Sequence, residues 1–117
     1  MSHRRAVLAL VMSALLVVAL SGPAQAGGVA RIRGNNRRWH PSSVSVTQGT
    51  RVVWRAVDVT HTVTAYGGNW SKDVTLSAGE RTSKTFRHAG TFKFRCTIHS
   101  TLIGGDCSGM CGRVVVT

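Results

Sequence analysis

One cysteine, two histidines and one methionine in this sequence have side chains that bind soft or borderline metal ions. Cys96 and His99 are separated by two residues, Met110 follows in the same segment, and His61 lies 35 positions before Cys96. Thiolate and thioether sulfur are soft donors and imidazole nitrogen is borderline, and a trigonal site of two histidines and one cysteine with a weak axial methionine favours copper. The Cys-x2-His spacing would allow one tight loop to supply two ligands, and the third would come from another strand. These four residues are therefore the candidate metal ligands.

Short strands must position these residues, because the sequence after residue 26 alternates polar and apolar side chains with a period of two. The predicted strands cover 43–47, 51–56, 61–65, 91–96 and 113–117. Turn-forming residues separate them, and no segment after residue 26 has the pattern of an amphipathic helix. Short strands at this spacing predict an all-β sandwich or barrel.

The strand 91–96 predicts which side of its sheet carries the thiol. Alternation places Phe92, Phe94 and Cys96 on one face. Lys93 and Arg95 fall on the other face, and a slip by one residue would bury both cations. We therefore expect Cys96 at the core-facing end of a strand, at the point where the chain enters a loop.

The first 26 residues have the layout of a secretory signal peptide. Two arginines precede the apolar run 6–20, and alanines at positions 24 and 26 match the small residues that a signal peptidase reads. A helix of that run would span about 22 Å at ~1.5 Å per residue, less than the ~30 Å of a hydrocarbon core. We predict a cleavable signal helix over 1–26, no permanent membrane span, and a domain over 27–117 that is periplasmic, in the cell envelope or extracellular.

With these elements the chain resembles the small cupredoxins of the plastocyanin and pseudoazurin type. The resemblance covers nearly all of residues 29–117. Its motifs are Trp39-His40-Pro41, Gln48-Gly49, Thr60-His61-Thr62-Val63-Thr64, Phe92-Lys93-Phe94-Arg95-Cys96-Thr97-Ile98-His99 and Gly109-Met110-Cys111-Gly112. It implies a Greek-key β-sandwich or barrel of the cupredoxin type holding one type 1 copper ion. The equatorial ligands would be His61, Cys96 and His99. The axial ligand would be Met110.

The same resemblance implies a function. The copper would cycle between Cu(I) and Cu(II), and the protein would carry single electrons between redox partners without acting as an enzyme. Thr62, which follows the first histidine, would tie the two ligand-bearing segments together by hydrogen bonding. The alternative function is a copper carrier or sequestering protein of the cell envelope, for which the long ligand loop and the basic surface would serve metal delivery.

The segment between the last two candidate ligands departs from the family pattern. Ten residues separate His99 from Met110, which is longer than is usual in the family. With Cys96 assigned to the metal, Cys107 and Cys111 remain as a pair. We expect a disulfide between them, which would close the loop on both sides of the methionine.

A structural zinc site is the competing interpretation of the same residues. Cys96, His99, Cys107 and Cys111 offer four zinc ligands within sixteen residues. This interpretation leaves His61 without a role and requires free thiols in a compartment where thiols oxidise. Copper is therefore favoured.

The chain is strongly basic, with 15 Lys and Arg against four Asp and Glu and a formal net charge of +11. We expect an acidic redox partner or an anionic cell-envelope surface, and we favour a monomer. Nucleic acid is disfavoured because the basic residues are spread along the chain and export removes it from most nucleic acid. The densest basic cluster is interpreted as a solvated sheet edge that discourages further pairing. It consists of Arg31, Arg33, Arg37 and Arg38.

Overall fold

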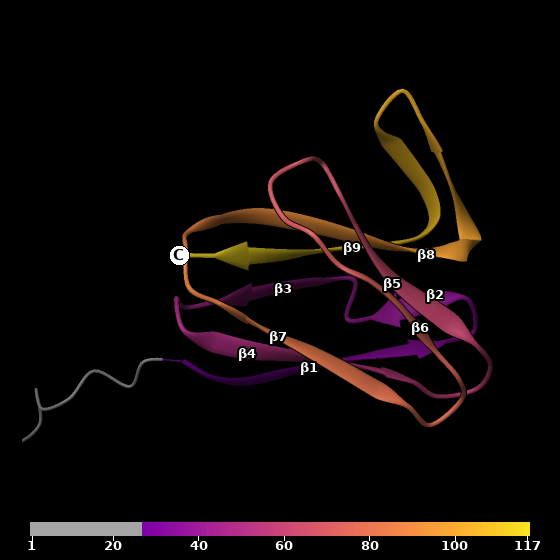
Figure 1. Cartoon of the computed structure of the whole chain (residues 1–117), viewed down its shortest axis with the longest axis horizontal. Coiled ribbons are helices and arrows are strands. Elements are labelled where there is room, and N and C mark those ends of the chain that lie inside the picture. The colour runs from indigo at the N-terminus through magenta and orange to yellow at the C-terminus, as the bar shows by residue number, and fades with distance from the viewer. Residues whose placement is uncertain (1–26) are drawn as a thin grey trace, which may run out of the picture.

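The computed structural model describes residues 27–117, which form two facing β-sheets and contain no helix (Figure 1). The strands are β1 (Gly28–Asn35), β2 (Arg38–His40), β3 (Ser43–Val46), β4 (Thr50–Ala56), β5 (His61–Tyr66), β6 (Asp73–Leu76), β7 (Arg81–Phe86), β8 (Gly90–Ile103) and β9 (Asp106–Val116). One sheet has the order β2-β1-β4-β7 and the other β3-β9-β8-β5-β6. The prediction of an all-β fold is therefore confirmed. The predicted signal helix lies outside the described residues, and none of the elements within 27–117 is a helix that could cross a membrane.

Both sheets are mixed, because each contains one parallel pair. β1 runs parallel to β4 in one sheet, and β3 runs parallel to β9 in the other. β2 and β3 follow each other closely in the chain but belong to different sheets. The chain therefore crosses from one layer to the other at 41–42 and links the two sheets near the end that carries β2.

Large apolar side chains fill the space between the sheets. Trp54 and Phe94 are fully buried and meet edge to face, with ring centroids 5.3 Å apart. Trp39 packs against Phe94 at 5.5 Å, also edge to face. Burial of each such side chain stabilises the fold by roughly 1.5–3 kcal/mol. The rings of Trp39, Trp54 and Phe94, here called the aromatic floor, pack beneath the residues that follow Phe94 on β8.

The faces of β8 agree with the predicted alternation. Phe92, Phe94 and Cys96 are buried in the core. Lys93 is exposed and Arg95 is half-buried. The predicted register of this strand is confirmed.

Four strands were not predicted, namely β1, β2, β6 and β7. β2 and β6 have only three and four residues, and β7 has a single apolar residue, so their period-two signal is weak. β1 does alternate from Ala30 to Arg33, and the sequence analysis missed this signal. β1 lies between β2 and β4, with Ile32 in the core and Arg31 and Arg33 on the outer face. The interpretation of this basic segment as a sheet edge is therefore wrong for Arg33, which lies between β2 and β4, whereas Arg31 pairs with β4 alone.

The expectation that the chain enters a loop directly after Cys96 is wrong, because the strand does not end there. β8 continues to Ile103, turns at 104–105 and returns as β9 from Asp106. Figure 1 shows this hairpin, in yellow, projecting from the sandwich. The long segment between the two candidate ligands is thus ordered by its own strand pairing.

Candidate metal centre

A β-bulge in β8 brings three of the four candidate ligands to one end of the sandwich. β8 pairs with β9 on both sides of the segment 96–99, and that segment lies opposite Met110 alone. A bulge bends its strand and re-aims side chains. Cys96 and His99 belong to the bulge, and the methionine faces it from β9.

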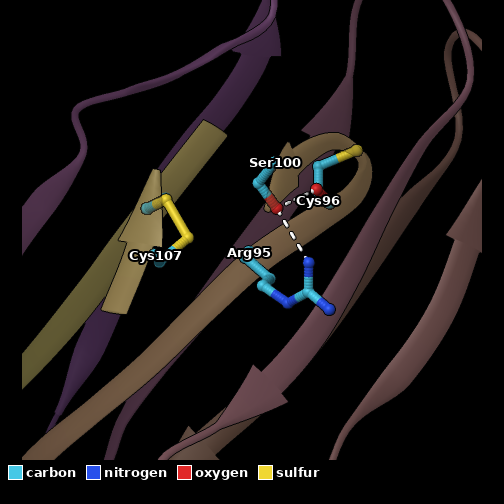
Figure 2. Close-up of a disulfide and its surroundings, with 5 residues drawn as sticks. Arg95, Cys96, Ser100 and Cys107 are labelled. Carbon is cyan, nitrogen blue, oxygen red and sulfur yellow. Dashed lines mark hydrogen bonds between the residues drawn. A yellow bond between two sulfur atoms is a disulfide. The ribbon is translucent and has the colours of Figure 1, made fainter. Parts of the chain in front are cut away.

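Two hydrogen bonds hold the bulge in shape (Figure 2). The Arg95 guanidinium donates to Ser100 Oγ at 3.1 Å, and Ser100 Oγ donates to the carbonyl oxygen of Cys96 at 2.5 Å. Gly109 lies across from Ser100 with φ of 102°, and a Cβ there would collide with the carbonyl oxygen of His99. The backbone around both candidate ligands is therefore fixed from two sides.

The ligand atoms of His61, Cys96 and His99 converge on one point. Nδ1 of His61 lies 3.2 Å from Nδ1 of His99. Sγ of Cys96 lies 3.8 Å from the first of these nitrogens and 3.6 Å from the second. Three atoms bound in one plane at about 2.0–2.3 Å from an ion would be about 3.5–4 Å apart. The spacing fits a single metal ion, and this donor set suits copper.

Met110 completes the donor set despite the long segment that precedes it. It is fully buried. A Cβ placed on Gly34 would lie 3.1 Å from Cε of Met110 and 3.1 Å from Cδ2 of His61. The thioether end of Met110 and the His61 ring therefore share the small space that a glycine leaves in β1. The four candidate ligands fit a single type 1 copper site.

Thr62 joins the two segments that carry ligands, as the resemblance implied. Its backbone N–H donates to Sγ of Cys96 at 3.3 Å. Its Oγ1 accepts the backbone N–H of Thr97 at 2.8 Å. β5 is thereby tied to the bulge of β8 at the thiol and at the residue that follows it.

Asp58 is a residue of this site that the sequence analysis missed. Its Oδ1 lies 2.8 Å from Nε2 of His61, and its Oδ2 accepts the backbone N–H of Asn36 at 3.0 Å. The hydrogen bond with His61 has the largest effect, and together these bonds hold the pKa of Asp58 well below its usual range. Because the carboxylate only accepts, Nε2 of His61 carries the proton and Nδ1 directs its lone pair toward Cys96. An acidic residue three positions before a candidate histidine, in a chain with four acids, was the available signal.

Replacing Asp58 by alanine should weaken copper binding by about 10- to 100-fold, the usual effect of losing the group that orients a metal-binding histidine. Competition with a coloured copper chelator measures the affinity. Asp106→Ala, at the hairpin turn, removes the same charge from a residue without contact to His61 and serves as the matched control. Equal affinity in the two variants would contradict the positioning role of Asp58.

His99 is the candidate ligand that reaches the surface. His61, Cys96 and Met110 are fully buried, whereas His99 is half-exposed. Burial lowers the pKa of His99, and the electrostatic effects of the neighbouring His61 and Arg37 lower it further. The ring is therefore held in the neutral form that can bind a metal.

The expected disulfide between Cys107 and Cys111 is present, and Figure 2 shows it beside the bulge. Cys96 is the free cysteine of the described residues. The disulfide uses two of the four ligands that a zinc site would require. The zinc interpretation therefore does not fit this structure.

Known structures share this architecture. The purple cupredoxin from Nitrosopumilus maritimus is 22% identical with a TM-score of 0.61, over 75% of this chain and 99% of that one. Amicyanin from Paracoccus versutus is 22% identical with a TM-score of 0.63, over 86% of this chain and 89% of that one. The chain has the cupredoxin fold.

The cupredoxin fold also occurs within larger enzymes. A copper-containing nitrite reductase from Thermus scotoductus is 20% identical with a TM-score of 0.62, over 75% of this chain and 22% of that one. No family model and no curated protein match the sequence. At these identities the likeness concerns the fold, and the function has to be argued from the site.

Proposed function

We propose that this cupredoxin-fold protein carries single electrons between redox partners through one copper ion held by the four candidate ligands. The observation that supports the proposal most is the convergence of one sulfur and two imidazole nitrogens, all within 4.8 Å of one another, at the buried end of the sandwich. When bound, the copper supplies a one-electron couple between Cu(I) and Cu(II). An ion already held by four side chains offers no vacant position to a substrate, so we propose a carrier and not an enzyme.

The surrounding residues restrict movement of the ligands. Asp58 fixes the His61 ring, Thr62 fixes the sulfur of Cys96, and the aromatic floor lies below. Ligands that keep their positions in both oxidation states reduce the rearrangement that accompanies each electron. The full burial of three ligands also disfavours the alternative of a copper carrier, because a receiving protein could contact the site only at His99.

The electron would leave through His99. A hollow of about 550 Å³ beside this ring is lined by apolar Val59 and Ile98 and by two charged residues, Arg37 and Asp58. The carboxylate of Asp58 is already engaged by its hydrogen bonds, which leaves Arg37 as the charge available to a partner. Val59 and Ile98 are 47% and 55% exposed. Apolar contact permits close approach of the partner, and the arginine favours an acidic one. We propose an exported protein with an acidic redox partner that docks on this surface.

Electron transfer to an acidic small redox protein should therefore slow as salt rises, because charges are screened beyond about 8 Å at physiological ionic strength. Stopped-flow mixing of the reduced, copper-loaded protein with the oxidised partner measures the association rate constant. Arg37→Asn keeps a residue type that tolerates the φ of 56° at this position. It should lower the rate about threefold at low salt.

Arg87→Asn is the matched control, because Arg87 is exposed and follows β7 outside the lining of the His99 hollow. Its rate should stay close to that of the parent protein. A rate that is flat in salt, a preference for a basic partner, or equal losses in the two variants would contradict the docking surface.

A further inference from the structure

The outer face of the β2-β1-β4-β7 sheet carries an ordered row of arginines that takes no part in the candidate copper site. Arg33 on β1 lies directly opposite Arg55 on β4, which lies directly opposite Arg81 on β7. Neighbouring strands are about 4.8 Å apart, so three like charges stand in register across three adjacent strands. Like charges directly opposite each other destabilise a sheet, so stability of the fold does not explain why these arginines are aligned.

Two more arginines extend the charge along the same face. Arg31 on β1 and Arg51 on β4 are each an even number of residues from their neighbour in the row, so they point to the same side. Within residues 27–117 no arginine or lysine nitrogen lies within 4.0 Å of a carboxylate oxygen, and the contact within this distance is the one between Asp58 and His61. Nε of Arg55 is buried and has no hydrogen-bond partner among the described residues. The five guanidinium groups therefore form no ion pair with the acidic side chains of the described part of the chain.

Two adjoining hollows run across this charged face. One has a volume of about 320 Å³ and is lined by Arg31, Ile32, Arg33, Val53, Arg55 and Arg81. The other has a volume of about 260 Å³ and is lined by Arg31, Arg51, Val53, Arg81, Thr82 and Ser83. Because they share three residues, the hollows form one groove over Val53, and charged side chains line both ends of it.

We propose that this arginine groove, formed by Arg31, Arg33, Arg51, Arg55 and Arg81, binds a linear phosphate polyanion. The planar guanidinium donates two parallel hydrogen bonds to phosphate oxygens. Regularly repeated phosphate groups can engage successive members of a regular row. A groove with charged walls suits an extended chain better than a flat bilayer surface. Basic protein faces that bind bilayers also insert apolar side chains into the membrane.

The groove and the candidate copper site lie on different sheets. Cys96 and His99 belong to β8, whereas the arginines belong to β1, β4 and β7. A polyanion bound in the groove would leave the His99 surface open to a redox partner. The proposal therefore does not rest on the electron-transfer function, and either can fail without the other.

The test is binding of inorganic polyphosphate of defined length to the purified chain, measured by calorimetry across a salt series. The logarithm of the affinity should fall with the logarithm of salt concentration, by about 0.7 for each phosphate contact, so four or five contacts give a slope of about −3. A triple variant of the row, called the row variant, carries Arg33→Gln, Arg55→Gln and Arg81→Gln. Its affinity for polyphosphate should be at least tenfold lower than that of the parent protein. Since it removes like-charge repulsion within the sheet, it should be at least as stable to urea as the parent protein, which excludes unfolding as the cause.

The matched control removes the same charge from elsewhere on the surface. It carries Arg87→Gln, Lys93→Gln and Arg113→Gln, all exposed positions outside the groove. Its affinity should change less than threefold. Equal losses in both triple variants would overturn the proposal in favour of net charge. Equally tight binding of polyglutamate would indicate an acidic protein, and binding to phosphatidylglycerol vesicles without binding to polyphosphate would indicate a lipid surface; both results would also overturn it.

Discussion

Replacing Cys96 by serine should abolish the intense visible absorption expected of the copper-loaded, oxidised protein. That band requires charge transfer from a thiolate sulfur, and serine offers a hard oxygen donor instead. Cys96 is fully buried, and its Sγ lies 3.6 and 3.8 Å from the two imidazole nitrogens. The absorption spectrum, together with narrow copper hyperfine splitting in electron paramagnetic resonance, measures the effect. We expect complete loss of both signatures.

The control for this prediction uses the other two cysteines. The double variant with Cys107→Ser and Cys111→Ser removes the disulfide but keeps the proposed ligand. It should retain the absorption band. Colour that persists in Cys96→Ser would exclude Cys96 as the thiolate ligand, and colour lost in both variants would mean that the hairpin disulfide is required to form the site.

Replacing Phe94 by alanine should give the largest loss of stability, about 3–5 kcal/mol, because it deletes a fully buried ring from a packed core. Phe94 meets Trp54 at 5.3 Å and Trp39 at 5.5 Å, both edge to face. Urea unfolding of the copper-free protein, followed by tryptophan fluorescence, measures the free energy of unfolding. Domains of this kind are typically stable by about 5–15 kcal/mol, so the variant should unfold at a much lower urea concentration.

Lys93→Ala is the matched control on the neighbouring position of the same strand. Lys93 is exposed, and its replacement should change the free energy of unfolding by less than about 0.5 kcal/mol. Phe94→Leu, which keeps more of the volume, should lie between the two. Losses of similar size for Phe94→Ala and Lys93→Ala would contradict the assignment of the two faces of β8.

The donor set and the strand that carries the thiol could be predicted because both are local properties. The soft and borderline donors are visible as residue types, and the alternation around Phe92 and Phe94 allows one register in which no cation is buried. The shared face then places Cys96 next to the core. The assignment of Cys96 to the metal, which the resemblance implied, left Cys107 and Cys111 as a pair, and the structure contains both the free thiol and that disulfide.

The geometry of the site depended on contacts between residues that are distant in the sequence. The bulge opposite Met110 arises because the hairpin pairs with itself beyond the ligands, so a longer segment does not move the methionine away. Asp58 lies three residues before His61, but its carboxylate is also held by the backbone N–H of Asn36, 22 positions away, so its orientation depends on β1 and the segment before β5 coming together. A sequence pattern reports neighbours along the chain and does not report such a long-range contact.

The alignment of charges has the same origin. In the sequence, Arg33, Arg55 and Arg81 lie in three separate segments, two of which were not predicted as strands. They form a row only because β1 pairs parallel to β4, and β4 antiparallel to β7, in one particular register. The sequence by itself determined the ligand types and the all-β architecture through residue chemistry and period-two alternation. Strand register, which depends on the packing of the whole sandwich, decided which distant side chains became neighbours.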